Sequence, residues 1–269
     1  MTSLRSAVAK TLAYSRHFGL PLTPEKLHHW LISDKPIGPE PIKKYFPVLT
    51  SAEKKTITER LRVSQKKHAA ALRVAGLLSF FPTIKMICST GSLAVDNAQD
   101  NDDLDFFIVT SANTLWLTRP LVIFLLKALG LRRPTSLPEH RSPVVSDKVC
   151  DNLWLDETAL ALPKNKLNLY TAHEVLQARP LFDRGNTYTK FIRANSWTSG
   201  YLANAYAFAK SRLSDSSSEE MTPSLSWGIV QKLNSLAFKL QYQYMKRKIT
   251  RETITLHSAY FHPNNPSPK

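Results

Sequence analysis

The stretch ICSTGSLAVDNAQDNDDLDFFIVT, residues 87–110, decides the fold of this chain. An apolar run is followed by Gly91 and Ser92, and then by an acidic segment that leads directly into a second apolar run. Short apolar runs bounded by glycine and polar residues are typical of buried strands. The sequence therefore predicts strands at 83–90 and 104–110, joined by a connection rich in carboxylates.

Two of these carboxylates, Asp103 and Asp105, stand at the start of the second predicted strand. Side chains two residues apart in a strand lie on the same face, about 7 Å apart along the backbone. Their repulsion is costly unless it is neutralised, and Mg²⁺, which takes oxygen ligands, is the usual cation. Gly91 would let a phosphate approach the backbone closely, and Ser92 offers a hydroxyl donor. We therefore expect a phosphate and a metal ion to meet in one cleft.

The next segments predict the rest of a small core. Apolar residues predict a helix over 113–129, and VCDNLWL at 149–155 predicts a third strand. Asp151 lies within this strand, where carboxylates are rarely needed for packing, so it is the candidate third acid of the site. Asp147 and Asp156 flank the strand and are the alternatives.

Helical patterns flank this core on both sides. The expected fold is α/β (α+β), with a basic helical module at 1–80 that resembles a winged helix, a mixed-sheet core at 81–163 and a helical region at 164–269. The flanking helices are predicted at 4–18, from Thr23, at 51–77, 166–178, 188–210 and 227–248. A linker is expected near 212–224 and a disordered tail at 262–269.

The chain is strongly basic, with 36 Lys and Arg against 21 Asp and Glu and a net charge of +15. Residues 1–90 carry 15 of the basic and 5 of the acidic side chains. Such a surface attracts polyanions, including nucleic acid and nucleotide phosphates, although a merely solvated face gives the same count. The alternative interpretation is therefore a nucleic-acid-binding regulatory protein with an inactive or ligand-sensing core.

The sequence does not indicate a membrane or secreted protein. Each apolar segment is shorter than the roughly 18 residues that a membrane span needs, and the N-terminal residues do not resemble a signal peptide. Cys88 and Cys150 fall in predicted strands, where free buried thiols act as small hydrophobic residues. We therefore expect a cytoplasmic protein, and the sequence leaves its oligomeric state open.

The residues at the core resemble a known family. Gly91-Ser92, ten intervening residues and Asp103-Leu104-Asp105 are similar to the hG[GS]-x(9–13)-Dh[DE]h signature of the DNA polymerase beta-like nucleotidyltransferase superfamily. The resemblance covers about residues 83–157 and extends to uncharacterised prokaryotic proteins with the same core. It implies a small mixed-sheet nucleotidyltransferase domain.

The resemblance also implies a reaction. A nucleoside monophosphate would pass from a nucleoside triphosphate, with ATP the first choice, to an acceptor that the motif does not identify. Ser92 would contact the β- and γ-phosphates, and Asp103, Asp105 and Asp151 would hold Mg²⁺. Arg119, on the helix after the second strand, would reach the triphosphate if it does not lie on the helix surface. If Asp151 does not join the other two acids, the site would bind nucleotide and metal without transfer.

Other metal motifs are incomplete. The acidic segment lacks the glycine of a calcium-binding loop. His173 and Glu174 lack the second histidine of a zinc-binding helix because Gln177 stands in its place, so both are expected to be structural. The remaining acids of the segment are expected to be merely solvated: Asp96, Asp100 and Asp102.

Overall fold

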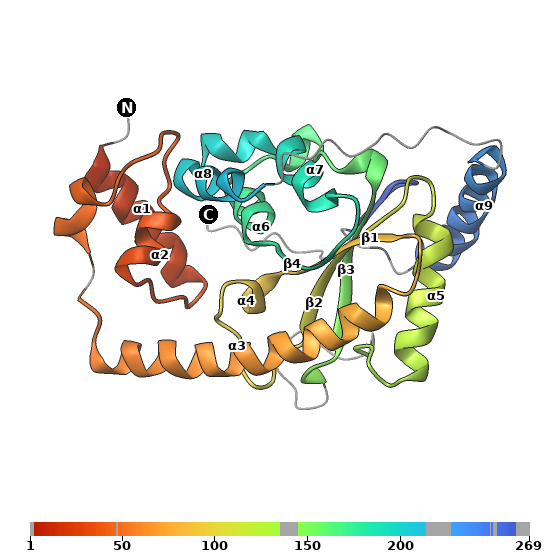
Figure 1. Ribbon diagram of the computed structural model, residues 1–269, viewed down its shortest axis with the longest axis horizontal. Helices are drawn as coiled ribbons and strands as arrows, with labels where there is room; N and C mark the ends of the chain where they lie inside the picture. Colours follow the sequence, from red (N-terminus) through yellow and green to blue (C-terminus); the bar gives the residue numbers. More distant parts are fainter. Residues whose placement is uncertain are drawn as a thin grey trace.

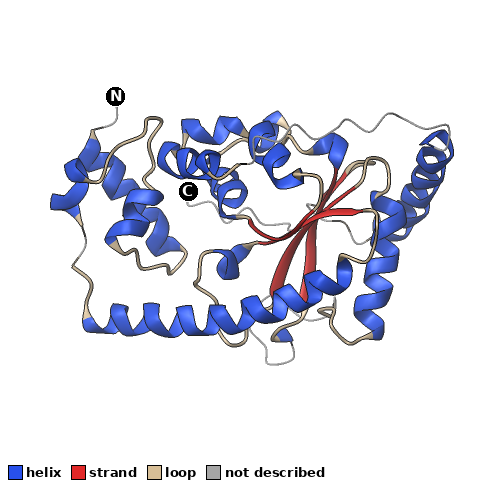
Figure 2. Ribbon diagram, viewed as in Figure 1, coloured by secondary structure: helices blue, strands red, loops and turns tan. Residues whose placement is uncertain are grey.

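A six-stranded mixed sheet forms the centre of the molecule (Figures 1 and 2). The strands β2 and β3 are parallel, and the other neighbouring strands are antiparallel. Their order across the sheet is β4 (Arg179–Asp183), β1 (Ile84–Ser89), β2 (Leu104–Thr110), β3 (Val149–Asp156), β6 (Ser258–Tyr260) and β5 (Thr253–Ile254). This sheet confirms the predicted α/β class and the three predicted strands, and β4, β5 and β6 are additional to the prediction.

The computed structural model describes residues 3–46, 48–134, 145–213, 227–247, 249 and 252–261. The predicted tail and all but the first two residues of the predicted linker lie outside this range.

Helices lie on both faces of the sheet (Figure 1). Their bounds are α1 Leu4–His17, α2 Pro24–His29, α3 Ser51–Leu78, α4 Gly91–Ala94, α5 Leu115–Ala128, α6 Leu169–Gln177, α7 Thr187–Ala194, α8 Ala203–Ser211 and α9 Trp227–Met245. Among the described residues, four helices begin with a side-chain N-cap: Ser3, Thr23, Thr50 and Asn168. At Thr23 the hydroxyl accepts from the Lys26 amide, and Thr50 forms a capping box with Glu53. None of the described helices combines the length and apolar character that a membrane crossing needs.

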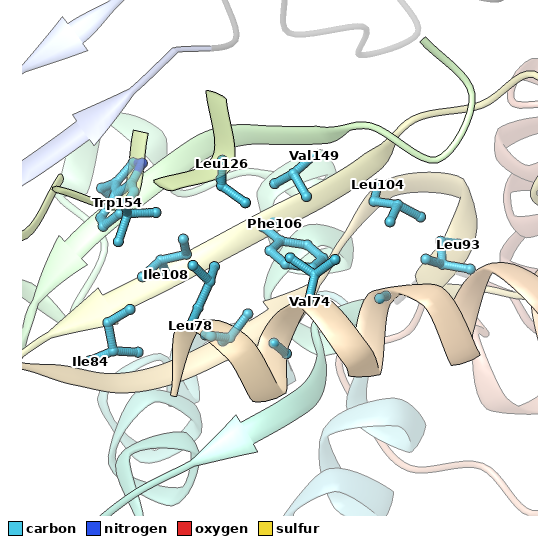
Figure 3. Packing of buried hydrophobic residues seen from close by; sticks show 14 of the residues in the cluster. Val74, Leu78, Ile84, Leu93, Leu104, Phe106, Ile108, Leu126, Val149 and Trp154 are labelled. Atoms are coloured by element: carbon cyan, nitrogen blue, oxygen red, sulfur yellow. The ribbon is translucent and has the colours of Figure 1, made fainter. Parts of the chain in front are cut away.

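The first face of the sheet packs against α3 and α5. A cluster of buried apolar side chains fills this interface. In it, Val74 and Leu78 of α3 lie near Phe106 and Ile108 of β2, as Figure 3 shows. All four side chains are buried, and burial of one such side chain contributes about 1.5 to 3 kcal/mol. The C-terminal half of α3 therefore packs as part of the core, although its sequence predicts a place in the N-terminal helical module.

The opposite face packs against α6, α7 and α8. Phe107 of β2 meets Phe191 of α7 edge-to-face, with ring centroids 5.0 Å apart. The short helices α1 and α2 have a small core of their own. Helix α1 contacts α6, where the rings of Tyr14 and His173 stack with centroids 4.3 Å apart, and α2 contacts α8, where His29 meets Phe208 edge-to-face. The N-terminal helices thus reach the same side of the sheet as α6.

Candidate functional site

The Asp105 carboxylate packs directly against Gly91, which follows β1 at the start of α4. Gly91 has a φ of 63°, and a Cβ atom at this position would lie 2.7 Å from Asp105 Oδ2. A side chain at position 91 would therefore force the Asp105 carboxylate to shift, and the left-handed backbone also favours glycine. The amide of Thr90 donates to the backbone oxygen of Asp105 at 3.0 Å, which fixes the turn against β2. The Gly-Ser pair and the Asp pair are therefore neighbours in space.

Asp103 and Asp105 lie close together, as their spacing predicts. The parallel register of β2 and β3 sets Asp105 beside Cys150. One carboxylate oxygen from each aspartate and the Cys150 sulfur all lie within 4.8 Å of one another. Asn152 Nδ2 donates to Asp105 Oδ1 at 2.8 Å and so orients this carboxylate. Two carboxylates and a thiol form a donor set that suits a divalent cation.

The electrostatics of this cluster favour a cation. Burial, followed by the charge of Asp105, raises the pKa of Asp103, and the nearby Arg133 guanidinium opposes that rise. Arg133 Nη1 lies 2.7 Å from Asp103 Oδ2. Burial also raises the pKa of the Cys150 thiol, and the neighbouring carboxylates add to the effect. The negative charge of the pair is therefore only partly offset by Arg133.

Asp151 does not join the two aspartates. Its carboxylate is almost fully buried on the α5 side of the sheet, where Oδ1 accepts from Arg132 Nε at 2.7 Å and Oδ2 lies 3.8 Å from Arg119 Nη2. Arg119 is itself buried, and its guanidinium lies 4.4 Å from the centre of the Phe261 ring. Asp151 and Arg119 therefore belong to a buried ion-pair cluster. Asp151 is not placed to bind the expected metal, and Arg119 is not placed to bind the expected triphosphate.

The two alternative third acids are also engaged elsewhere. Asp147 Oδ1 accepts from Lys67 Nζ at 2.8 Å, and Asp156 Oδ2 lies 2.8 Å from His257 Nδ1. Within β3, all of which the structure describes, the residues that face Asp105 are Cys150 and Asn152. The expected third carboxylate is therefore replaced by a thiol and an amide.

Two acids of the acidic segment, Asp96 and Asp102, make specific contacts within the protein. Asp102 Oδ2 accepts from the Ser92 hydroxyl at 2.8 Å and from the Gln99 amide at 2.9 Å. Asp96 pairs with Arg179 at 3.4 Å, while Asp100 is exposed as expected. The solvated assignment is therefore incorrect for Asp96 and Asp102. Contact of the Ser92 hydroxyl with a phosphate would require exchange of its Asp102 partner.

A cavity of about 660 Å³ opens beside the carboxylate of Asp105. This volume lies within the range of about 300 to 1,000 Å³ that is typical of small-molecule sites. One wall carries Gly91, Ser92, Asp105 and Asn152. The other walls carry residues of α1 and its C-cap, of α6 and of the segment before α6: Tyr14, Phe18, Lys166, Tyr170, His173 and Glu174. The sequence does not identify α1 as part of this cavity, because only the fold brings α1 to α6.

His173 is a distinctive member of that wall. Burial lowers the pKa of its imidazole to about 3, with a further contribution from His29, so the ring is neutral near pH 7. Its Nδ1 accepts from Gln177 Nε2 at 3.2 Å, and its buried Nε2 has no hydrogen-bond partner among the described residues. The sequence predicts a structural role for His173, and the residue also lines the cavity, where its imidazole is neutral and its Nε2 has no hydrogen-bond partner among the described residues.

Comparison of the chain with protein-family models, curated proteins and solved structures gives no match. The features of the molecule that bear on function are the cluster of Asp103, Asp105 and Cys150 and the cavity beside Asp105.

Proposed function

We propose that the chain is a nucleotidyltransferase that depends on a divalent cation and takes a nucleoside triphosphate, ATP being the first candidate. The observation that carries the proposal is the absence of a Cβ at Gly91, which lets the Asp105 carboxylate lie against the Gly-Ser turn. This contact brings a turn suited to phosphate and the Asp105 carboxylate to the wall of one cavity, and Asp103 lies beside Asp105 to complete a pair of acids suited to a cation.

The residues divide the chemistry between them. When bound, the divalent cation would neutralise charge on the triphosphate and on the departing pyrophosphate. Asp103 and Asp105 hold that cation, and Asn152 keeps the Asp105 carboxylate oriented. Lys166, on the cavity wall, supplies a positive charge for the phosphates. The acceptor oxygen bonds to the α-phosphorus, the bond to pyrophosphate breaks, and the acceptor proton passes to water. Positioning and charge neutralisation account for most of such catalysis.

Nucleotide binding measured by calorimetry tests this proposal. We expect ATP, CTP, GTP or UTP to bind the wild-type chain when Mg²⁺ or Zn²⁺ is present, and binding to disappear in the Asp103→Asn, Asp105→Asn double variant, which lacks the charge that holds the cation. Asp100→Asn is the matched control, because Asp100 is an exposed acid of the same segment and should leave binding unchanged. The proposal fails if no triphosphate binds with either cation.

A second candidate function is favoured by a row of basic side chains on α3. Lys55, Arg62, Lys66 and Arg73 are exposed and are spaced seven, four and seven residues apart. This spacing aligns them along one side of the helix over about 27 Å. Lys67 is not part of this α3 basic row, because its side chain is only 4% exposed and hydrogen-bonds the acidic segment. The row suits the phosphate backbone of a nucleic acid.

The salt dependence of nucleic-acid binding tests the α3 basic row. The Lys66→Gln, Arg73→Gln variant should reduce the slope of log K against log salt by about 2, because each phosphate contact contributes about 0.9 for duplex DNA. The Lys43→Gln, Lys44→Gln variant, which neutralises two exposed lysines outside α3, is the control. Anisotropy of a labelled duplex gives the slopes. Equal slopes in both variants would remove this second function.

A further inference from the structure

The third donor at the metal cluster is sulfur and not oxygen. Cys150 lies beside Asp105 in the parallel register, on the face where the resemblance implies a third carboxylate. Its sulfur and one oxygen each from Asp103 and Asp105 lie within 4.8 Å of one another. Cys150 is partly exposed, whereas Cys88, the other cysteine, is completely buried. The two cysteines therefore have different surroundings.

This donor set does not match Mg²⁺ well. Mg²⁺ takes oxygen ligands in near-octahedral geometry and usually keeps several waters. A thiolate selects softer cations, and zinc accepts both cysteine sulfur and carboxylate oxygen as ligands. The ligand atoms of a tetrahedral zinc ion lie about 3.5 Å apart, given bond lengths of about 2.1 to 2.3 Å. Because the three donor atoms lie within 4.8 Å of one another, side-chain shifts of about 1 Å are enough to reach that value.

The surroundings of the cluster support a bound dication. With a thiolate and two carboxylates the ligands carry three negative charges, which a dication and the adjacent Arg133 balance. Arg133 Nη1 lies 2.7 Å from Asp103 Oδ2 and 3.9 Å from Cys150 Sγ. Asn152 donates to Asp105, as outer partners of metal ligands commonly do. Because a carboxylate has about four lone-pair sites, these hydrogen bonds leave capacity for a cation.

We propose that Asp103, Asp105 and Cys150 bind a sulfur-binding divalent cation of the zinc class in preference to Mg²⁺. The cation is the one that the proposed nucleotidyltransferase site uses, so its role in catalysis rests on that proposal, whereas its binding does not. On binding, the Cys150 S–H proton is released to solvent and the sulfur forms the bond to the metal.

Cadmium binding to the full-length, reduced and nucleotide-free chain tests this inference, because a cadmium–thiolate bond absorbs in the ultraviolet. We expect one cadmium ion per chain with this absorption, displaced by Zn²⁺ and not by a large excess of Mg²⁺. Cys150→Ser should abolish the absorption and weaken Zn²⁺ binding by more than about 100-fold, since loss of even an outer partner costs about 10- to 100-fold. Cys88→Ala, the control, should retain both.

Cys150→Asp gives a second test in the opposite direction. It restores an all-oxygen set, so Mg²⁺ affinity should rise while Zn²⁺ affinity falls. Circular dichroism and thermal unfolding show whether each variant is folded. Displacement of cadmium by stoichiometric Mg²⁺, retention of the absorption in folded Cys150→Ser, or no cadmium binding to wild type would each overturn the inference. If the inference is overturned in this way but the chain still binds a nucleotide with Mg²⁺, the proposed nucleotidyltransferase function stands. If the chain binds zinc but no nucleotide, the zinc site stands and the proposed function fails.

Discussion

Replacing Gly91 by alanine should eliminate cation-dependent nucleotide binding while the protein remains folded. The new Cβ would lie 2.7 Å from Asp105 Oδ2, so the carboxylate must move away from the Gly-Ser turn. A displacement of about 1 Å in a catalytic site can lower the reaction rate about 100-fold, and here the displaced group is also a proposed ligand of the cation. The left-handed backbone of Gly91 adds about 1 to 2 kcal/mol of strain for any residue with a Cβ. Calorimetry measures the binding loss, and urea unfolding measures the loss of stability.

Gly130→Ala separates the steric clash from the strain. Gly130 has a φ of 64°, almost the same as Gly91, but a Cβ there would meet no atom within 4 Å. Both variants should therefore lose a similar free energy of unfolding, and only Gly91→Ala should lose nucleotide binding. Equal binding by the two variants would show that the contact between Gly91 and Asp105 is not needed for the site.

The sequence predicts the elements whose pattern is local. The strands β1, β2 and β3 are apolar runs of six to eight residues, and they appear where the pattern places them. The edge strand β4, RPLFD, follows α6 directly, contains Pro180 and is mostly exposed, so its sequence resembles a loop. The helix predicted over 188–210 is interrupted at Ser196–Gly200. There the buried Asn195 side chain bonds the backbone of Leu160 and Leu162, a long-range contact that no helical pattern reveals.

In the candidate site too, the local sequence pattern predicts some of the residues, and long-range strand pairing determines the others. Gly91, Asp103 and Asp105 come together because a short turn and a period of two determine their positions. The parity of Asp151 within β3 does not show which neighbour faces Asp105, because that depends on the register between strands. The pairing places Cys150 opposite Asp105 and Leu153 opposite Phe107, so β3 has one residue more than β2 in this interval. Such a bulge is set by tertiary packing.

Replacing Asp151 by asparagine should greatly lower the free energy of unfolding and should leave cation binding unchanged. The side chain of Asp151 is only 2% exposed, and those of its partners Arg119 and Arg132 are 10% and 13% exposed. The asparagine has nearly the same shape but leaves two buried guanidinium groups without a counter-charge. Breaking a buried ion pair in this way costs about 3 to 5 kcal/mol. We therefore expect a large loss in the free energy of unfolding, measured in urea.

Asp103→Asn should show the reverse behaviour, which makes the pair of variants decisive about where the third acid lies. Neutralising Asp103 leaves Arg133 without its partner at 2.7 Å. Burial and Asp105 already disfavour the charge on Asp103, however, as its raised pKa indicates, so the loss of stability should be smaller than in Asp151→Asn. The same change removes a ligand and should remove cation binding. Folded Asp151→Asn protein should bind the cation with wild-type affinity, since its carboxylate lies on the other face of the sheet with Arg132. If it is instead stable and does not bind the cation, Asp151 belongs to the metal set, and the arginine pair is not its main partner.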